Sequence, residues 1–356
     1  MNLLLLTENW PPRIGGIEKY LTGLIDGLER EKDIIVHVIE PSKKRIFWPV
    51  IRPAWLPLFL YIWKFVKREQ IDIVLCGKAL FEGLVGYYLK KYLQIPYVVF
   101  TYAMEIEMWL RNPRTHRKLV RVLKNADKVV VINDVTKKRI IDLGISVDKI
   151  VKIYPALDDQ FLQRIKKGDD QGNILAKYKL PHPYILTVAR LVPRKGIDDL
   201  IRAYAKLDQV TFTNIDLVII GDGPHRKALE QVAEGEFVRP HFLGAVPDED
   251  LPALFANARL FALTPKNVAG DIEGFGIVYL EAAAAGLPIV ATRTGGVPEA
   301  VQSLPNHVLI DSGNVDAIAD ALIKLLSQDK ILSTPNASPR YVDRAQQLLT
   351  ALRQID

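Results

Sequence analysis

The chain contains the run Tyr184-Ile185-Leu186-Thr187-Val188-Ala189-Arg190-Leu191-Val192-Pro193-Arg194-Lys195-Gly196, in which an apolar segment passes into a basic loop. Residues 184–188 are almost continuously apolar, which is typical of a strand in a parallel sheet that is covered on both faces. A helical pattern follows over residues 197–207. Since a strand, a loop and a helix in this order make half of a βαβ unit, the run predicts an α/β fold.

Comparable apolar runs alternate with helix-length segments along most of the chain. They cover residues 3–6, 34–39, 71–75, 97–100, 129–132 and 150–153 in the first half, and 184–188, 216–220, 241–243, 260–263, 289–291 and 307–309 in the second. The pattern predicts two Rossmann-like domains with doubly wound parallel sheets, at residues 1–165 and 180–338, facing each other across a cleft. The polar stretch 163–179 is interpreted as the linker region, and a C-terminal helix at about 340–356 could pack back on the first domain.

The composition is that of an ordinary globular protein, with 49% hydrophobic and 25% charged residues among 356. A single cysteine, Cys76, cannot form an internal disulfide and suits a reducing compartment. The first residues lack the basic segment of a secretory signal, and the longest uncharged apolar stretch, residues 53–63, is shorter than the roughly 20 residues of a membrane span. We therefore expect a cytoplasmic protein without a membrane-spanning anchor.

Charge is distributed unevenly along the chain. Residues 1–157 hold 26 Lys and Arg against 16 Asp and Glu, which is +10, whereas the remainder holds 21 against 25, which is −4. The first half is therefore expected to face something anionic. We favour peripheral contact with an anionic membrane, since aromatic and basic residues mix over 45–68 and a basic stripe has helical spacing. The stripe consists of Arg114, Arg117, Lys118, Arg121 and Lys124.

Two alternatives accompany the membrane prediction. Residues 58–66 could instead pack as a helix in the domain core. Nucleic acid is not expected as a partner, because no recognisable nucleic-acid-binding module accompanies the charge.

Loops that follow strands carry residues that suit a phosphate-containing ligand, because ligands bind beyond the carboxyl ends of the strands in such sheets. Gly15 and Gly16 precede a helical pattern, so their N–H groups could approach an anion; a turn that needs positive φ would explain them equally well. Arg190 and Lys195 could neutralise a diphosphate, the alternative being solvated surface charge. Gly221 lies in another glycine-rich strand exit, which alone is a weak signal.

Residues 271–281 combine glycines with two carboxylates. Gly274, Phe275 and Gly276 open a helix expected over 275–285 and make a second candidate anion site. Glu273 and Glu281 are eight residues apart. That spacing is roughly 12 Å along a helix axis, which suits one carboxylate for a sugar and one for a ribose on either side of a diphosphate. The alternative for Glu281 is a buried carboxylate with a structural partner.

Together, these segments resemble glycosyltransferase family 4, whose members are retaining enzymes of the GT-B fold. The resemblance covers nearly the whole chain and rests on Pro12-Arg13-Ile14-Gly15-Gly16-Ile17-Glu18, on Ala189-Arg190-Leu191-Val192-Pro193-Arg194-Lys195-Gly196, and on the pair Glu273 and Glu281. Its wording is most similar to that of bacterial phosphatidylinositol mannosyltransferases, which transfer mannose from GDP-mannose to a membrane lipid.

The resemblance implies a role for each of these residues. Gly16 would place its N–H near the donor diphosphate, and Arg190 and Lys195 would stabilise charge on the leaving nucleoside diphosphate. Glu281 would hold the ribose hydroxyls, and Glu273 would contact the donor sugar near its reacting centre. No metal or other cofactor is implied, because the two cations and a helix dipole would neutralise the diphosphate. The other donor-binding positions expected are Gly15, Gly221, Gly274, Phe275 and Gly276.

One position departs from the family pattern. The family usually has Thr-His-Gly with an acid two residues later, whereas this chain has Thr101-Tyr102-Ala103-Met104-Glu105. Tyr102 could donate a hydrogen bond in the catalytic centre, but a phenol with a pKa near 10 is a poor base at neutral pH. Altered acceptor handling is the expected consequence.

We therefore expect a retaining hexosyltransferase, with mannose favoured, that acts on a lipid or lipid-linked glycan. Two alternatives remain open. One is an enzyme of the same fold that uses UDP-glucose or another donor on a soluble acceptor. The other is a nucleotide-sugar-binding protein that has lost transfer through the change at Tyr102.

Overall fold

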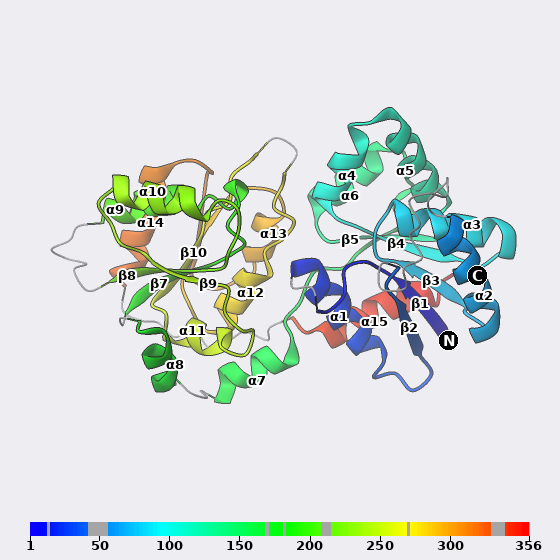
Figure 1. Ribbon diagram of the computed structural model, residues 1–356, viewed down its shortest axis with the longest axis horizontal. Helices are drawn as coiled ribbons and strands as arrows, with labels where there is room; N and C mark the ends of the chain where they lie inside the picture. Colours follow the sequence, from blue (N-terminus) through cyan, green and yellow to red (C-terminus); the bar gives the residue numbers. More distant parts are fainter. Residues whose placement is uncertain are drawn as a thin grey trace. The chain divides into compact units, whose positions relative to one another are not determined.

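The computed structural model describes residues 1–12, 15–41, 56–167, 171–180, 183–207, 215–268, 271–328 and 339–355. Arg13 and Ile14, which carry part of the family resemblance, lie outside these ranges, as does the 45–55 part of the aromatic and basic stretch. The chain divides into two compact units (Figure 1), one of Met1–Ala156 with Arg340–Asp356 and the other of Leu157–Pro339.

The first unit is built on a sheet of six parallel strands. These are β1 (Asn2–Leu6), β2 (Ile35–Ile39), β3 (Ile73–Cys76), β4 (Tyr97–Thr101), β5 (Lys128–Val131) and β6 (Ile150–Lys152). Their order in the sheet is β2-β1-β3-β4-β5-β6. The order reverses between β1 and β3, which is the place where sheets of this type bind ligands beyond the strand ends.

Helices cover both faces of this sheet, as the unbroken apolar strands predict. The helices are α1 (Gly16–Leu28), α2 (Leu56–Glu69), α3 (Phe81–Leu93), α4 (Ala103–Leu110), α5 (Pro113–Asn125), α6 (Asp134–Asp142) and α15 (Tyr341–Leu352). Alternate residues of β1 enter two cores. Leu3 and Leu5 pack with α1 and α15, whereas Leu4 and Leu6 pack with α2, α3, α5 and α6.

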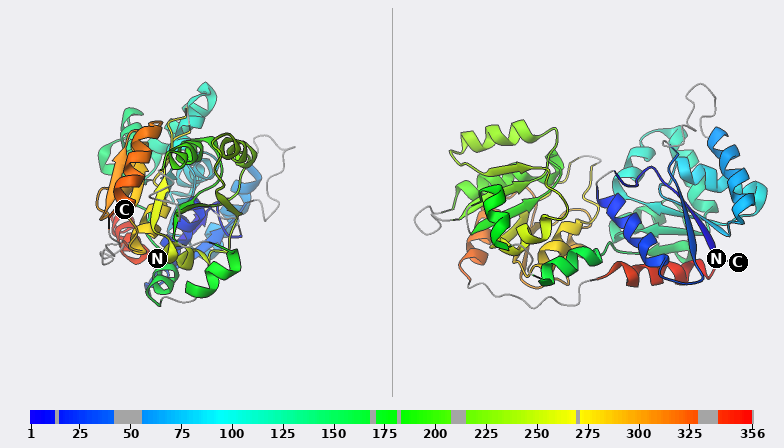
Figure 2. Two further views of the ribbon diagram at one scale, coloured as in Figure 1. Left: turned by 90° about the vertical axis from the view of Figure 1, so that its left-hand side faces the viewer. Right: turned by 60° about the horizontal axis from the view of Figure 1, so that its bottom comes forward.

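The C-terminal helix α15 lies against α1 in both figures, and the two helices are close enough to require small residues between them. A Cβ at Gly23 would lie 2.3 Å from the ring of Tyr341, and one at Gly27 would lie 2.6 Å from the Cβ of Ala345. Figure 2 shows this helix in red beside the blue α1. Helix α15 therefore completes the core of the first unit, whose other helices and strands lie within residues 1–156.

The second unit repeats the architecture with another six parallel strands. They are β7 (Tyr184–Val188), β8 (Asp216–Ile220), β9 (His241–Gly244), β10 (Leu260–Leu263), β11 (Ile289–Thr292) and β12 (His307–Ile310), in the order β12-β11-β10-β7-β8-β9. The order here reverses between β7 and β10. The twelve strands expected from the sequence are all present, and the prediction of an α/β chain with two parallel sheets is confirmed.

The helices of the second unit also lie on both faces of its sheet (Figure 1). They are α7 (Asp159–Lys167), α8 (Gln171–Tyr178), α9 (Ile197–Ala205), α10 (Arg226–Gly235), α11 (Leu251–Asn257), α12 (Ile277–Ala284), α13 (Val297–Val301) and α14 (Val315–Leu326). Residues of α9, α10 and α14 share one core with β7, β8 and β10. These helices and strands fix the loops at the carboxyl ends of the strands.

The segment interpreted as a linker holds the helices α7 and α8, with residues 168–170 outside the described ranges. The compact unit begins at Leu157, earlier than the boundary expected from the sequence. The reason is that α7 is amphipathic and packs on α11, with the rings of Phe161 and Phe255 5.9 Å apart. Polar composition alone did not reveal this buried face.

The two segments considered for membrane contact differ in character. On α5 the five basic residues are exposed, whereas Leu119, Val122 and Leu123 are buried as expected. On α2 the aromatic residues serve the core to a greater extent, since Phe59 is buried and Trp63 and Phe65 pack against the same core. Among the described residues, none of the helices has both the length and the apolar composition needed to span a bilayer.

Candidate active site

Three loops of the second unit converge on Glu273. It lies in the segment between β10 and α12, and its side chain is 8% exposed. The loop after β7 provides the short helix Pro193–Lys195, and the Nζ of Lys195 is 2.7 Å from Oε2 of Glu273. The loop after β11 holds the backbone, because the N–H of Gly296 donates to the carbonyl of Glu273 at 3.0 Å. Since β7 and β10 flank the reversal of strand order, this is the ligand-binding position of the fold.

Glu273 is ionised in this environment. Burial by itself raises the pKa of a carboxyl, but the ammonium of Lys195 and the guanidinium of Arg194 outweigh it and hold the pKa of Glu273 below its ordinary value. An ionised carboxylate that is nine-tenths buried can accept hydrogen bonds from ligand hydroxyls more strongly than a neutral acceptor.

Arg194 is the residue of this cluster to which sequence reasoning gave no role. Its side chain is 16% exposed, and its Nη1 pairs with Oε2 of Glu273, the oxygen that Lys195 also contacts. Its Nε lies 2.7 Å from Oδ1 of Asp271, as an ion pair without hydrogen-bond alignment. The motif places two adjacent cations in the loop, but only the fold shows that both turn toward Glu273 and that Arg194 also faces Asp271.

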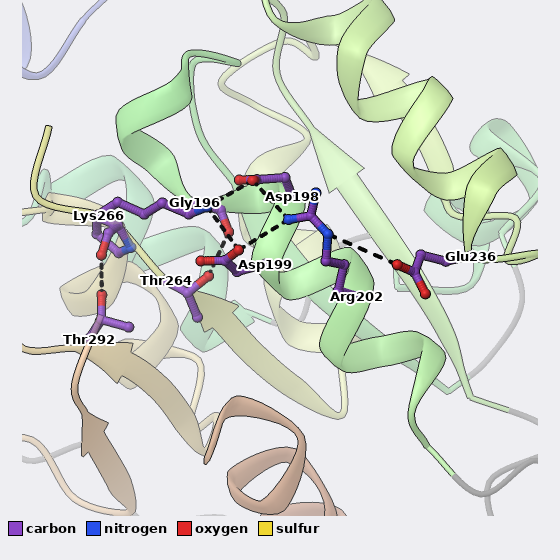
Figure 3. A network of polar contacts seen from close by, with 9 residues as sticks. Gly196, Asp198, Asp199, Arg202, Glu236, Thr264, Lys266 and Thr292 are labelled. Carbon is purple, nitrogen blue, oxygen red and sulfur yellow. Dashed lines mark hydrogen bonds and ion pairs between the residues drawn. The ribbon is translucent and has the colours of Figure 1, made fainter. Parts of the chain in front are cut away.

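A polar network anchors the loop that carries Arg194 (Figure 3). The backbone N–H of Lys266, in the loop after β10, donates to the carbonyl of Arg194 at 2.7 Å. The ammonium of Lys266 lies 2.7 Å from Asp198 and 2.8 Å from Asp199, at the start of α9. Arg202 contacts the same two carboxylates from the next turn of α9. The loops after β7 and β10 are therefore fixed to one another beside Glu273.

Two glycines near the cluster are required by close backbone approach. Gly221 has a φ of +124°, and a Cβ there would lie 1.9 Å from the carbonyl oxygen of Ala189. Gly295 has a φ of +52°, and its Cβ would lie 2.1 Å from the carbonyl oxygen of Glu273. Gly221 thus has a structural reason for being glycine, whatever it contacts in a complex.

The other donor-binding residues expected in the second unit lie in loops that follow strands and in α12. Arg190 is the second residue after β7 and is exposed, and the guanidinium beside Glu273 is that of Arg194. Gly276, with a φ of +90°, is the N-cap of α12, which begins two residues later than expected. Gly274 precedes it, Phe275 is buried, and Glu281 lies buried within α12.

The expected residues of the first unit surround the carboxyl ends of β1 and β4. Gly15 is the N-cap of α1 and Gly16 its first residue, so Gly16 lies within the helix that it was expected to precede. Tyr102 follows β4 and is 6% exposed, and its hydroxyl has no hydrogen-bond partner among the residues that the structure describes. Burial, with contributions from Tyr20 and nearby carboxyls, raises the pKa of Tyr102, so it is a neutral donor and not a base.

Two buried acids lie near Tyr102, namely Glu105, which is the acid of the motif that departs from the family pattern, and Glu82, which the sequence analysis did not single out. Glu82 is the second residue of α3, and Glu105 lies in α4 and accepts a hydrogen bond from the N–H of Ala79 at 3.0 Å. Burial raises the pKa of Glu82 to about 7. Burial and the nearby carboxyl group of Glu82 raise the pKa of Glu105 to about 8. The pattern of single acids at the start of helices gave no sign that both would be enclosed.

The described part of the chain holds no group of three or more His, Cys, Asp or Glu residues that could bind a metal ion. The charged cluster at Glu273 instead pairs two cations, Arg194 and Lys195, with two carboxylates, Asp271 and Glu273.

The two halves of the chain match two family models. Residues 14–161 match Glycosyltransferase Family 4, and residues 171–341 match Glycosyl transferases group 1. A GDP-mannose-dependent alpha-(1-6)-phosphatidylinositol monomannoside mannosyltransferase of Mycolicibacterium smegmatis is 31% identical over 360 residues, covering 95% of this chain and 93% of the relative. A GDP-mannose-dependent monoacylated alpha-(1-6)-phosphatidylinositol monomannoside mannosyltransferase of Corynebacterium glutamicum is 28% identical over 353 residues, covering 91% and 88%.

Solved structures agree with this assignment at the level of the fold. HepE of Anabaena, crystallised with UDP and glucose, has a TM-score of 0.77 at 20% identity and covers 99% of both chains. Sucrose-phosphate synthase of Thermosynechococcus elongatus has a TM-score of 0.76 at 18% identity and covers 99% of this chain and 98% of its own. With two parallel six-stranded sheets, matches to both family models and a relative above 30% identity along nearly its full length, the chain belongs to the family 4 glycosyltransferases of the GT-B fold.

Proposed function

We propose that this glycosyltransferase moves a hexose, with mannose favoured, from a nucleoside-diphosphate donor to a lipid or lipid-linked glycan. The observation that carries the proposal is the 31% identity, over 95% of the chain, to a mannosyltransferase named for GDP-mannose and a phosphatidylinositol mannoside. Three further mannosyltransferases named for the same donor are 28% identical over more than nine-tenths of the chain.

In this proposal, the cluster at Glu273 is the donor site. Lys195 and the exposed Arg190 bind the diphosphate, and Glu273 accepts hydrogen bonds from hydroxyls of the hexose. Glu281 holds the ribose from α12. Backbone groups at loop ends and helix starts also contribute, and they belong to Gly15, Gly16, Gly221, Gly274, Phe275 and Gly276. No metal ion is needed, because the two cations and the positive end of α12 offset the charge of the diphosphate.

The proposed transfer retains the configuration of the donor carbon. The bond between that carbon and the phosphate oxygen breaks as the acceptor oxygen bonds from the same face. The leaving phosphate takes the proton of the acceptor hydroxyl, so the step needs no protein base. Tyr102 is neutral and buried, and it serves as a hydrogen-bond donor that orients the sugar or the acceptor.

For the acceptor, we propose an anionic membrane surface that the basic face of α5 contacts. The double variant Arg117→Glu with Arg121→Glu should weaken binding to phosphatidylglycerol-containing vesicles by at least roughly 2 kcal/mol, thirtyfold or more, since each basic residue near an anionic leaflet contributes about 1 kcal/mol and the introduced carboxylates are repelled. Lys227→Glu with Lys324→Glu is the matched control, because both lysines are exposed on the second unit. Equal binding by the two double variants, or equal binding to neutral vesicles, would remove α5 from the proposal.

The test of the donor is nucleotide release from a panel of GDP-, UDP- and ADP-sugars, each with and without a mixed lipid extract. Release from GDP-mannose that increases with lipid supports the proposal. Release from UDP-glucose without dependence on lipid would favour the soluble-acceptor alternative. Binding of GDP without release from any donor would favour a protein that has lost transfer, and Tyr102→His would then be the first variant to examine.

A further inference from the structure

We infer that Arg194 is a positioning residue for Glu273. It pairs with both Glu273 and Asp271, and it keeps Glu273 in place while Lys195 turns from Glu273 to the donor diphosphate. The inference rests on the proposed function and adds to it a residue that the expected donor contacts leave without a role. Three observations support it: the contacts of the Arg194 guanidinium, the fixed backbone of the loop after β7, and the presence of two cations at one oxygen of Glu273.

The first argument is that Arg194 and Lys195 share one carboxylate oxygen. Both cations contact Oε2 of Glu273, with Lys195 at 2.7 Å. Two cations at one oxygen are more than its ionisation needs. Lys195 has a flexible stem with a point charge at its end, so it can move to a phosphate at little cost, whereas the planar guanidinium of Arg194 is suited to a fixed geometry.

The second argument is that Arg194 reaches two carboxylates with different nitrogens. Nη1 contacts Glu273 and Nε faces Asp271 at 2.7 Å, so the guanidinium ties two points of the same segment together. A lysine would have to place one ammonium between both carboxylates, whereas the guanidinium reaches each of them with a separate nitrogen. The side chain of Asp271 is 36% exposed, which makes it the weaker anchor of the two.

The third argument is that the backbone of Arg194 cannot follow a ligand. Its carbonyl accepts the N–H of Lys266, whose ammonium is held by Asp198 and Asp199 (Figure 3). When Lys195 engages the diphosphate, Glu273 keeps Arg194 as its counter-charge. Without Arg194, a carboxylate 8% exposed would be left unpaired during transfer, which favours its protonation and its displacement.

The experiment compares Arg194→Gln with Lys195→Gln, and includes Arg194→Lys and Asp271→Asn. For Arg194→Gln we expect GDP affinity by calorimetry within a few-fold of the wild type, and kcat for donor turnover lowered about 100-fold, as for a misplaced reacting group. The acid limb of the kcat–pH profile should move upward by roughly one pH unit or more. Lys195→Gln should lose GDP affinity. Arg194→Lys should restore the acid limb but only part of kcat, and Asp271→Asn should lower kcat less than Arg194→Gln.

Two outcomes overturn the inference. If Arg194→Gln loses GDP affinity as Lys195→Gln does, Arg194 is a donor ligand; if its kcat and acid limb equal those of the wild type, it has no role in placing Glu273. Acid unfolding gives a second readout that does not depend on turnover. With GDP bound, so that the diphosphate engages Lys195, the midpoint of acid unfolding should rise in Arg194→Gln and rise no further in Arg194→Gln with Glu273→Gln. If the two substitutions change the midpoint additively in the double variant, the coupling between Arg194 and Glu273 is refuted. A wild type that neither binds nor turns over any donor refutes only the proposed function.

Discussion

Lys266→Met removes one of the two cations that contact Asp198 and Asp199 in Figure 3, while keeping most of the volume of the side chain. The ammonium of Lys266 is 2.7 Å from Asp198 and 2.8 Å from Asp199, whose side chains are 18% and 7% exposed. Breaking a buried ion pair by removing one partner costs about 3–5 kcal/mol. Arg202 remains beside both carboxylates and the Lys266 side chain is 26% exposed, so we expect a loss of about 2 kcal/mol. For a unit of this size that loss lowers Tm by about 4–8 °C.

The assay is thermal and urea unfolding, with GDP added to identify the transition of the second unit. Lys206→Met is the matched control, because Lys206 pairs with Asp316 at the surface, with side chains 51% and 80% exposed. Its effect should stay within about 0.5 kcal/mol. The ion pair lowers the pKa of Asp198, so its stabilisation is present above the ordinary value of 3.8 and is lost as the pH falls through the lowered value. Equal losses in Lys266→Met and Lys206→Met, or a difference that persists in strong acid, would refute this reasoning.

Three further predictions concern the first unit and the glycine-rich loops. Gly16→Ala should leave Tm unchanged, because a Cβ there meets nothing within 4 Å, whereas Gly221→Ala should lower Tm. If Gly16→Ala loses donor turnover at an unchanged Tm, the backbone of Gly16 lies at the donor. The pKa of Glu105, raised to about 8, means that stability is fully present below the unfolded-state value of 4.5 and falls as the pH rises toward 8. Glu105→Gln should flatten that slope by about 1.4 kcal/mol per pH unit between those two values, and an unchanged slope from pH 5 to 8 would exclude Glu105 as its source. Tyr102→Phe should leave the free energy of unfolding unchanged or raise it by up to about 1 kcal/mol, because no hydrogen bond is lost. Slower transfer by this variant would show that the hydroxyl acts on substrate.

The fold could be read from the sequence because parallel strands covered on both faces leave a simple signal. Leu3 to Leu6 are consecutive, and the structure assigns alternate members to two different cores. Short apolar runs mark all twelve strands, although β6, β9 and β12 are only half-buried. The polar stretch containing α7 was interpreted as a linker region, whereas α7 packs on α11 through a face that includes the buried ring of Phe161.

The site could be predicted in part, because a motif names residues but not the direction in which they point. Lys195 and Glu273 were expected in one site, and the structure brings them together. The contacts of Arg194 with Asp271 and Glu273 depend on how the loops after β7 and β10 cross, which spacing along the chain does not contain. The approach of Gly295 to Glu273 has the same origin, since it comes from the loop after β11.

The most direct test of the donor site is a crystal structure of the protein with GDP-mannose. We expect the diphosphate within hydrogen-bond distance of Arg190 and Lys195, the hexose at Glu273, the ribose at Glu281, and Arg194 still paired with Glu273 and Asp271. A nucleotide bound away from the carboxyl ends of β7 and β10, with Lys195 still on Glu273, would contradict the account.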